Sequence, residues 1–579
     1  MECINHDDII VVAPADESLT YSENGAPAVS LVGMTTVKGR KVPLEGGAMA
    51  RVVAARMDQD DELWGCMVAL NTLAVRSSNY RDSLLVAARP LLAKIHDPAS
   101  RGEIYRLIAY TRDIAEGKGE RDITYTLLYQ VAVLGYGAEV KRLLKLFPTT
   151  GYGYWGDLVN LYNYIDARGN SEQASDMKSW ILKTLMYQAR HDERLLVQHE
   201  HRVANGGSPT AKPSISLVGK WLPSEGKKKD VQSNIGKALA ALMYPSGRSL
   251  ARYRQTCSKL RSHLQLVERS MSSNKWGEID PSATPAKAMK KYRKVFMNSK
   301  GSEDAGRVLL AEKLTELLSG KTDKTIKTKG LQFYELIKTY VDGGAHDEVI
   351  EAQAKTIIKD MQALVRDGRF PLSVALCDVS GSMSGIPMIV SIALGILVAN
   401  IMPAPWAGRV ITFESRPQWV SISLSSSIWS QVQVVREAPW GGSTNFTAAV
   451  ELVLQEALRE GGAAPQFLFC FTDMQFDAAA EDKRSFVIDD LKAKFARHEL
   501  VMPNVVLWNL RASGTCSFAA DKDTGGVGML SGFSQSAFKA FMTGCDFDHM
   551  TPMGLLKEAL HSARYDAAAA CVSDAMVAE

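Results

Sequence analysis

A short polar segment in the C-terminal third of the sequence has the side chains of a site for a hard metal ion. Asp378, Ser380 and Ser382 place one carboxylate and two hydroxyls on a tight loop directly after an apolar run. Gly381 allows this loop to turn sharply, so that both hydroxyls can face one point. Mg²⁺ prefers oxygen ligands and commonly uses only one or two carboxylates while it keeps several waters. The segment therefore predicts a site for Mg²⁺ or another divalent cation.

Two further segments offer oxygen side chains in the same manner. The stretch GGSTN at 441–445 places the Thr444 hydroxyl in a loop before a predicted helix, and Asp473 closely follows the apolar run QFLFCF. The predicted ligand set is therefore Asp378, Ser380, Ser382, Thr444 and Asp473. The alternative is a domain of the same fold that keeps these loops and holds no ion, because many Ser- and Gly-rich loops only cap a helix.

The surrounding pattern indicates which elements position these residues. Apolar, strand-like runs occupy 370–377, 409–413, 418–422, 466–471 and 500–508, and helical stretches at 387–401, 446–460 and 485–497 fall between them. Strands that alternate with helices predict a doubly wound parallel α/β sheet. Ligands of such sheets bind at the carboxyl ends of the strands, which is where the polar residues lie.

One apolar segment is nearly long enough to cross a membrane. Residues 386–406 carry no charge, but they begin directly after the polar loop and contain Ser391, Asn400 and three prolines. A helix buried between the sheet and its neighbours explains this segment better than a membrane span. We therefore expect no membrane partner.

The order of the three polar segments resembles the metal-ion-dependent adhesion site of von Willebrand factor A domains. The resemblance implies that residues 367–579 form such a domain and that the five predicted ligands hold its metal. In domains of this kind the protein rarely completes the coordination sphere, and water or an acidic group of a partner fills the open position. The resemblance thus implies metal-mediated binding rather than catalysis.

The preceding part of the chain has helical periodicity. Between residues 48 and 366, apolar residues recur at helical spacing in runs such as 62–75, 80–96 and 124–135, with short connections between them. Successive helices of this kind predict an irregular α-solenoid without a fixed sequence repeat. Residues 1–47 are expected to form an irregular N-terminal arm. The predicted fold class is therefore α plus α/β, with three segments at 1–47, 48–366 and 367–579.

Charge is unevenly distributed along the 579 residues. Residues 201–330 contain 26 Lys and Arg against 10 Asp and Glu, whereas 367–579 contain 15 against 22. Within the basic segment, Lys287, Lys290, Lys291 and Lys294 share one helical face, with Arg293 beside them. Such a stripe suits contacts with phosphates. A solvated basic face, or one that packs on the acidic domain, is the alternative.

Several helical motifs resemble those of TROVE-type proteins. The sequence RDI at 112–114 followed by GKGER at 117–121, YGYWGDL at 152–158 and KWLPSEG at 220–226 follow the order of that family, and 263–280 resembles a Ro-like family of unknown function. The resemblance covers roughly residues 50–570. In the related Ro autoantigens, a ring of helical repeats binds single-stranded RNA ends and structured small RNAs. The resemblance therefore implies RNA binding, and the Lys-rich segments 227–229 and 321–329 depart from the family pattern.

The residues themselves leave the role of the GKGER motif open. It does not follow a strand and lacks the G-x-x-x-x-G-K-[ST] pattern of a phosphate loop. Lys118 and Arg121 are candidate phosphate contacts, but together with Arg112 they could equally join a buried network of charges between helices. Tyr154 and Trp155 are expected to fill the core between helices rather than to stack on bases.

Together these patterns predict a ribonucleoprotein component rather than an enzyme. The chain has no H-E-x-x-H motif and no G-x-S-x-G elbow, and we expect no catalytic residues. Its eight cysteines form no CxxC pair, and the acidic N-terminus does not resemble a secretion signal, which favours a cytoplasmic location, with a nuclear one left open. The expected function is binding of single-stranded, misfolded or structured non-coding RNA. The alternative is a metal-dependent scaffold that recognises an acidic residue of a protein partner.

Overall fold

The protein divides into two compact units. The computed structural model describes residues 34–37, 40–43, 62–75, 81–169, 171–208, 212–366, 371–413, 416–438, 445–462, 464–473, 484–511, 525–544 and 550–573. Unit 1 comprises Met1–Gln130, Gln332–His346 and Ile357–Glu579, and unit 2 comprises Val131–Leu331 and Asp347–Thr356. These units do not coincide with the predicted division at residue 366, because the helices before residue 130 pack with the C-terminal sheet.

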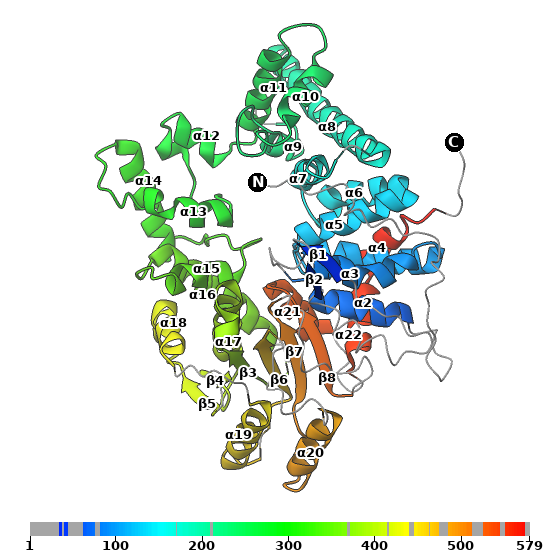
Figure 1. The fold of residues 1–579 in the computed structure, drawn as a ribbon. Coiled ribbons are helices and arrows are strands. Elements are labelled where there is room, and N and C mark those ends of the chain that lie inside the picture. Colours follow the sequence, from blue (N-terminus) through cyan, green and yellow to red (C-terminus); the bar gives the residue numbers. More distant parts are fainter. Residues whose placement is uncertain are drawn as a thin grey trace. The chain divides into compact units, whose positions relative to one another are not determined.

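Unit 1 is built on a six-stranded mixed sheet. Its strands follow the order β5-β4-β3-β6-β7-β8 (Figure 1). Their bounds are β3 Ser373–Asp378, β4 Arg409–Phe413, β5 Gln418–Ser421, β6 Phe467–Thr472, β7 Asn504–Asn509 and β8 Val527–Ser531. β3 pairs in parallel with both β4 and β6, and the parallel pairing continues through β7 to β8. The helical region followed by strands and helices agrees with the predicted combination of elements.

The expectation of an all-parallel sheet is wrong at one edge. β5 runs antiparallel to β4, with Arg409 opposite Ser421. Only residues 414–417 connect the two strands, whereas a parallel crossover needs a dozen or more residues. The short connection therefore dictates a hairpin. β8 is a further edge strand that the pattern did not predict.

The C-terminal helices of unit 1 follow the strands closely. Their bounds are α17 Ile386–Ile401, α18 Ile428–Arg436, α19 Phe446–Arg459, α20 Arg484–Ala496, α21 Gln535–Gly544, α22 Pro552–Leu560 and α23 Asp566–Ala569. α17 is buried from Met388 to Ile401 and packs on β3, which confirms the expected buried helix. Its approach is so close that a Cβ at Gly395 would lie 2.3 Å from the Cys377 sulfur. Among the described residues, no helix is both long and apolar enough to cross a membrane.

Four N-terminal helices also belong to unit 1. They are α2 Glu62–Leu73, α3 Arg81–Ala93, α4 Pro98–Arg112 and α5 Asp122–Val131, whose last residue already lies in unit 2. α2 packs against β8 and α22, and α4 packs against α23. α15 (Phe333–Val341) and the second half of α16 (Glu348–Arg366) return to this unit, and α15 packs against α17. β1 (Met34–Val37) and β2 (Arg40–Pro43) form a hairpin in the predicted N-terminal arm.

Unit 2 is helical among its described residues. It contains α6 Gly137–Thr150, α7 Trp155–Asp166, α8 Glu172–Ala204, α9 Val218–Trp221, α10 Ile235–Met243, α11 Ser249–His263, α12 Val267–Ser272, α13 Ala286–Phe296 and α14 Ala305–Leu318. A single turn of π-helix, Ala132–Tyr136, precedes α6. Met289 and Phe296 of α13 pack with Leu310 and Leu314 of α14 in one buried cluster. Helices therefore fill the predicted range, and their arrangement as a solenoid stays a prediction.

Candidate functional site

Two carboxylates lie where the strand order of the sheet reverses. From β3 the chain first builds β4 and β5 on one side and then returns to place β6 on the other. Asp378 is the last residue of β3, and Asp473 directly follows β6. Since β3 and β6 are parallel neighbours, their carboxyl ends meet at the same edge. A crevice at such a reversal is the usual ligand site of an open α/β sheet.

The loop after β3 is folded by hydrogen bonds within the motif. The backbone N–H of Ser380 donates to Asp378 Oδ1 at 2.9 Å, and the Ser380 and Ser382 hydroxyl oxygens lie 2.9 Å apart. Residues Gly381–Met383 form one 3₁₀ turn, and Gly385 takes a φ of 94° before α17 begins. This φ lies in the left-handed region, which glycine adopts without strain. The loop thus brings the Asp378 carboxylate and the two serine hydroxyls together.

Burial and charge both act on Asp378. The side chains of Asp378 and Asp473 are fully buried. Burial raises the pKa of the Asp378 carboxyl to about 6, hydrogen bonds from Ser380 and Thr472 oppose this rise, and the nearby Asp473 carboxylate adds to it. The anion is therefore held in a place that disfavours negative charge, and a cation bound there would compensate both carboxylates.

Thr472 takes part in this site although the sequence did not single it out. Its hydroxyl donates to Asp378 Oδ2 at 2.7 Å, and its side chain is fully buried. The signal was present in the sequence, because Thr472 directly precedes Asp473 on an otherwise apolar strand. Thr472 fixes the orientation of the carboxylate that accepts its proton.

Thr444, the remaining predicted ligand, lies outside the described residues. The next residue, Asn445, is described and caps α19, with its side-chain oxygen accepting from the Ala448 N–H at 3.0 Å. The loop before Asn445 therefore ends at a helix start, as the sequence predicted.

The donor set that is described fits a hard cation. Two carboxylates and two serine hydroxyls supply oxygen only, which suits Mg²⁺. Among the described residues there is no group of three or more His, Cys, Asp or Glu side chains that could hold a metal. The set at Asp378 and Asp473 has only two such residues, because hydroxyls supply the rest.

The GKGER motif is folded into the interior of unit 1. Lys118 is only 1% exposed, and its ammonium donates to the Asn71 carbonyl at 2.5 Å and to the Ser531 hydroxyl at 2.6 Å. Burial lowers the pKa of Lys118 to about 7, and the Glu120 carboxylate opposes that fall. A Cβ at Gly117 would lie 2.2 Å from the Tyr110 carbonyl oxygen, so this position requires glycine. Lys118 is therefore not available to RNA phosphates, whereas Arg121 is exposed at the start of α5.

The neighbouring Asp113 joins distant parts of the chain. It is fully buried, and both carboxylate oxygens accept from the guanidinium of Arg564. The hydroxyl of Tyr565 donates to the same carboxylate at 2.9 Å. The segment after α4 is thus fastened to the segment before α23, which favours the structural interpretation of this motif.

The basic stripe lies on α13 of unit 2. Ala286, Met289 and Phe296 of this helix are buried. The predicted cations are on the rest of its surface: Lys287, Lys291 and Lys294 are exposed, and Lys290 and Arg293 are partly buried. Arg293 is engaged by Asp347, with 2.7 Å between Nε and Oδ2. Lys291 donates to the Tyr292 hydroxyl at 2.9 Å. The lysines remain candidates for phosphate contact, and Arg293 has a structural contact.

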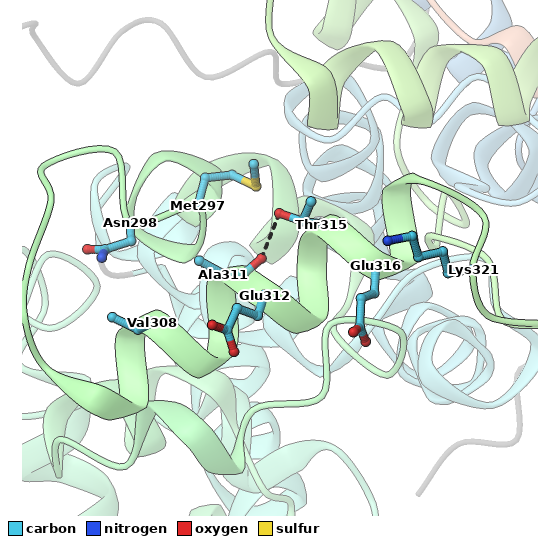
Figure 2. A pocket seen from close by; sticks show the side chains of 8 residues that line it. All are labelled: Met297, Asn298, Val308, Ala311, Glu312, Thr315, Glu316 and Lys321. Atoms are coloured by element: carbon cyan, nitrogen blue, oxygen red, sulfur yellow. Dashed lines mark hydrogen bonds between the residues drawn. The ribbon is translucent and has the colours of Figure 1, made fainter.

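A depression of about 480 Å³ lies beside this stripe, between the end of α13 and α14 (Figure 2). Glu312 and Glu316 line it together with Lys321, and the Thr315 hydroxyl donates to the Ala311 carbonyl of its own helix at 2.9 Å. The depression is shallow, and its polar side chains are exposed. We assign it no ligand.

Comparison with known proteins places the chain among uncharacterised relatives. Residues 187–366 match the family described as domain of unknown function DUF2828, and residues 372–569 match domain of unknown function DUF7788. The uncharacterised protein L728 of Acanthamoeba polyphaga mimivirus is 33% identical over 471 residues, which cover 79% of this chain and 78% of the viral protein. The chain therefore belongs to the same family as this viral protein and carries a DUF2828 segment followed by a DUF7788 segment.

Proposed function

We propose that the protein is an RNA-binding protein of the TROVE or Ro-like type. Unit 2 binds the phosphate backbone of single-stranded, misfolded or structured non-coding RNA. The sheet of unit 1 acts as a von Willebrand factor A-type domain that binds a divalent cation. The role of both parts is binding, and no residue is assigned to catalysis.

The observation that carries the RNA proposal is the separation of charges in unit 2. This unit has 35 Lys and Arg against 21 Asp and Glu. Among its described residues the buried charged side chains are all acidic, namely Glu139, Asp157, Asp192, Asp230 and Glu351, and no Lys or Arg is buried. Cations at the surface are the groups that displace counterions from a nucleic acid. The α13 lysines form the densest described run of them.

The metal proposal depends on the switch point of the sheet. Asp378, Ser380, Ser382 and Asp473 would hold the cation, with Thr444 as the fifth predicted ligand. When bound, the cation supplies a positive centre that accepts one further oxygen ligand. Thr472 keeps the Asp378 carboxylate oriented, and the Ser380 N–H holds its other oxygen.

RNA binding is tested by fluorescence anisotropy across a salt series. The wild type is compared with the Lys287→Glu/Lys290→Glu/Lys291→Glu/Lys294→Glu variant. The matched control reverses four exposed lysines on other helices, Lys183, Lys237, Lys355 and Lys359. Each lost phosphate contact should flatten the plot of log affinity against log salt by about 0.7, so the stripe variant should lose about 3 from the slope.

Two results would overturn the RNA proposal. One is the absence of RNA binding by the wild type near physiological salt. The other is an equal loss in the stripe and control variants, since that would reflect net charge alone. A steep wild-type slope that only the stripe variant flattens supports it.

A metal-dependent protein scaffold is the second candidate function. It is favoured by the two buried carboxylates at the strand reversal, which suit a cation shared with an acidic partner residue. This function predicts that chelation and Asp378→Ala both abolish a protein–protein contact in a pull-down, while Asp360→Ala, on an exposed part of α16, leaves it intact. A contact that survives chelation and Asp378→Ala would contradict it.

A further inference from the structure

Three consecutive lysines in unit 2 have no role in the functions considered so far. Lys227, Lys228 and Lys229 follow the short helix α9, and Lys220 lies within that helix. Lys220, Lys227 and Lys228 are exposed, and Lys229 is partly buried. We call residues 220–230 the lysine loop.

A buried carboxylate shapes the lysine loop from inside. Asp230 is 2% exposed, and its two oxygens accept from the backbone N–H groups of Gly226 at 2.9 Å and Gly236 at 2.6 Å. Asn163 of α7 donates to the Lys229 carbonyl at 2.9 Å. The only carboxylate at this position is therefore directed at the backbone, and the lysine side chains are left at the surface.

The first half of the loop is held with equal precision. The guanidinium of Arg261 donates to the Gly219 carbonyl at 3.0 Å and to the Leu222 carbonyl at 2.6 Å. The buried Tyr253 donates its hydroxyl to the Pro223 carbonyl at 2.8 Å. Side chains of α11 thus hold this stretch before any ligand arrives, which lowers the entropic cost of binding.

An aromatic pair fixes two of the lysines without neutralising them. The rings of Tyr154 and Trp221 are stacked with centroids 4.5 Å apart. The Lys229 ammonium lies 4.4 Å from the Trp221 centroid and that of Lys220 lies 5.6 Å from it. A cation held over a π face keeps its full charge, unlike one in an ion pair. The loop is consequently a fixed concentration of positive charge.

We infer that the lysine loop is a second phosphate-contact site for single-stranded RNA, in addition to the α13 stripe. This inference depends on the proposed function, because it assigns a second contact for the same ligand. An RNA strand is favoured over an anionic lipid surface because the α13 stripe belongs to the same unit and offers a further run of lysines. A polyanion long enough to reach both sites binds more tightly than either site alone would allow.

The test compares RNA oligomers of about 8 and about 24 nucleotides, since only the longer strand can join separate sites. The variant Lys220→Gln/Lys227→Gln/Lys228→Gln keeps Lys229 over Trp221 and so preserves the packing of the loop. Its matched control is Lys183→Gln/Lys355→Gln/Lys359→Gln, which removes three exposed charges elsewhere. Thermal melting shows whether each variant is folded.

The expected result is a loss of roughly 10- to 50-fold in affinity for the longer RNA and a slope smaller by about 2, with the control unchanged. Wild-type affinity and slope in the loop variant would overturn the inference, and the proposed function would survive if the α13 variant still lost binding. An absence of RNA binding by the wild type would overturn the proposed function itself. Loss of binding to phosphatidylserine vesicles with unchanged RNA affinity would assign the loop to a membrane surface and overturn the inference as well.

Discussion

The two units treat charged side chains in opposite ways. The buried cations of the described residues, Arg101, Arg112 and Lys118, all lie in unit 1. Unit 2 buries carboxylates instead, and Asp230 and Asp192 use theirs to hold backbone or hydroxyl groups of nearby loops. A lysine in unit 1 can therefore be part of the core, whereas the lysines of unit 2 remain available to a ligand.

This difference shows why a basic motif does not by itself indicate a polyanion site. Lys118 and Lys291 are both lysines in positively charged motifs. Lys118 is enclosed by a carbonyl, a hydroxyl and a nearby carboxylate, while Lys291 lies on an exposed helical face. Substitutions in the two units should consequently have different kinds of effect, on stability in unit 1 and on ligand affinity in unit 2.

The largest expected effect is that of Asp113→Ala. The change leaves the Arg564 guanidinium and the Tyr565 hydroxyl without the carboxylate that they share. Breaking a buried pair from one side typically costs about 3–5 kcal/mol, which should lower the melting temperature of unit 1 by several degrees. Glu116→Ala is the control, since this side chain is 61% exposed and lies 3.8 Å from Arg564. Equal shifts in the two variants would contradict the buried-network interpretation.

Lys118→Met should change how stability depends on pH. Burial holds the pKa of Lys118 near 7, below its ordinary value of 10.5, so between these values the unfolded chain binds more protons than the folded one. The wild type should therefore gain stability as pH rises from about 7 to about 10, and the Met variant should lack this gain. Melting temperatures measured across that range decide the matter, and parallel curves for both proteins would refute the prediction.

Thr472→Val should weaken metal binding without abolishing the fold. Valine keeps the shape but removes the hydrogen bond that orients Asp378. Loss of such a supporting contact typically costs about 10- to 100-fold in metal affinity. Titration calorimetry with Mg²⁺ or Mn²⁺ measures it, and Thr412→Val, a buried threonine on the neighbouring strand β4, is the control. Unchanged affinity in the Thr472 variant would count against the metal site.

Lys291→Ala should have the smallest effect on stability. An exposed substitution of this kind usually changes stability by no more than about 0.5 kcal/mol. The salt slope of RNA binding should fall by about 0.7, the value for a single phosphate contact on a single strand. A drop in melting temperature comparable to that of Asp113→Ala would erase the contrast between the two units.

Most of the sheet could be predicted because apolar strands and amphipathic helices have different periods. The predicted strands at 409–413 and 466–471 lie within a residue of β4 and β6. β8 was missed because Gly528 interrupts its pattern. A Cβ there would lie 2.6 Å from Leu555 of α22, so packing rather than strand propensity selects this glycine.

The candidate site could be predicted in part. Asp378, Ser380 and Ser382 are brought together by hydrogen bonds within a few residues, which spacing alone reveals. The partnership of Thr472 with Asp378 depends on the pairing of β3 with β6, which is a contact between residues 94 positions apart. The burial of Lys118 likewise depends on Ser531, 413 residues away, and no local pattern carries that information.

The three-part construction of unit 1 has a consequence for synthesis on the ribosome. Asp113 must wait for Arg564, 451 residues later, before its carboxylate meets its cation. At about 5–20 residues per second this delay lasts roughly 20–90 s. Unit 2, which the ribosome finishes well before that, can fold during the wait, whereas the N-terminal helices of unit 1 remain without the strand and helices on which they pack. A nascent chain should therefore depend on chaperones mainly for these early helices.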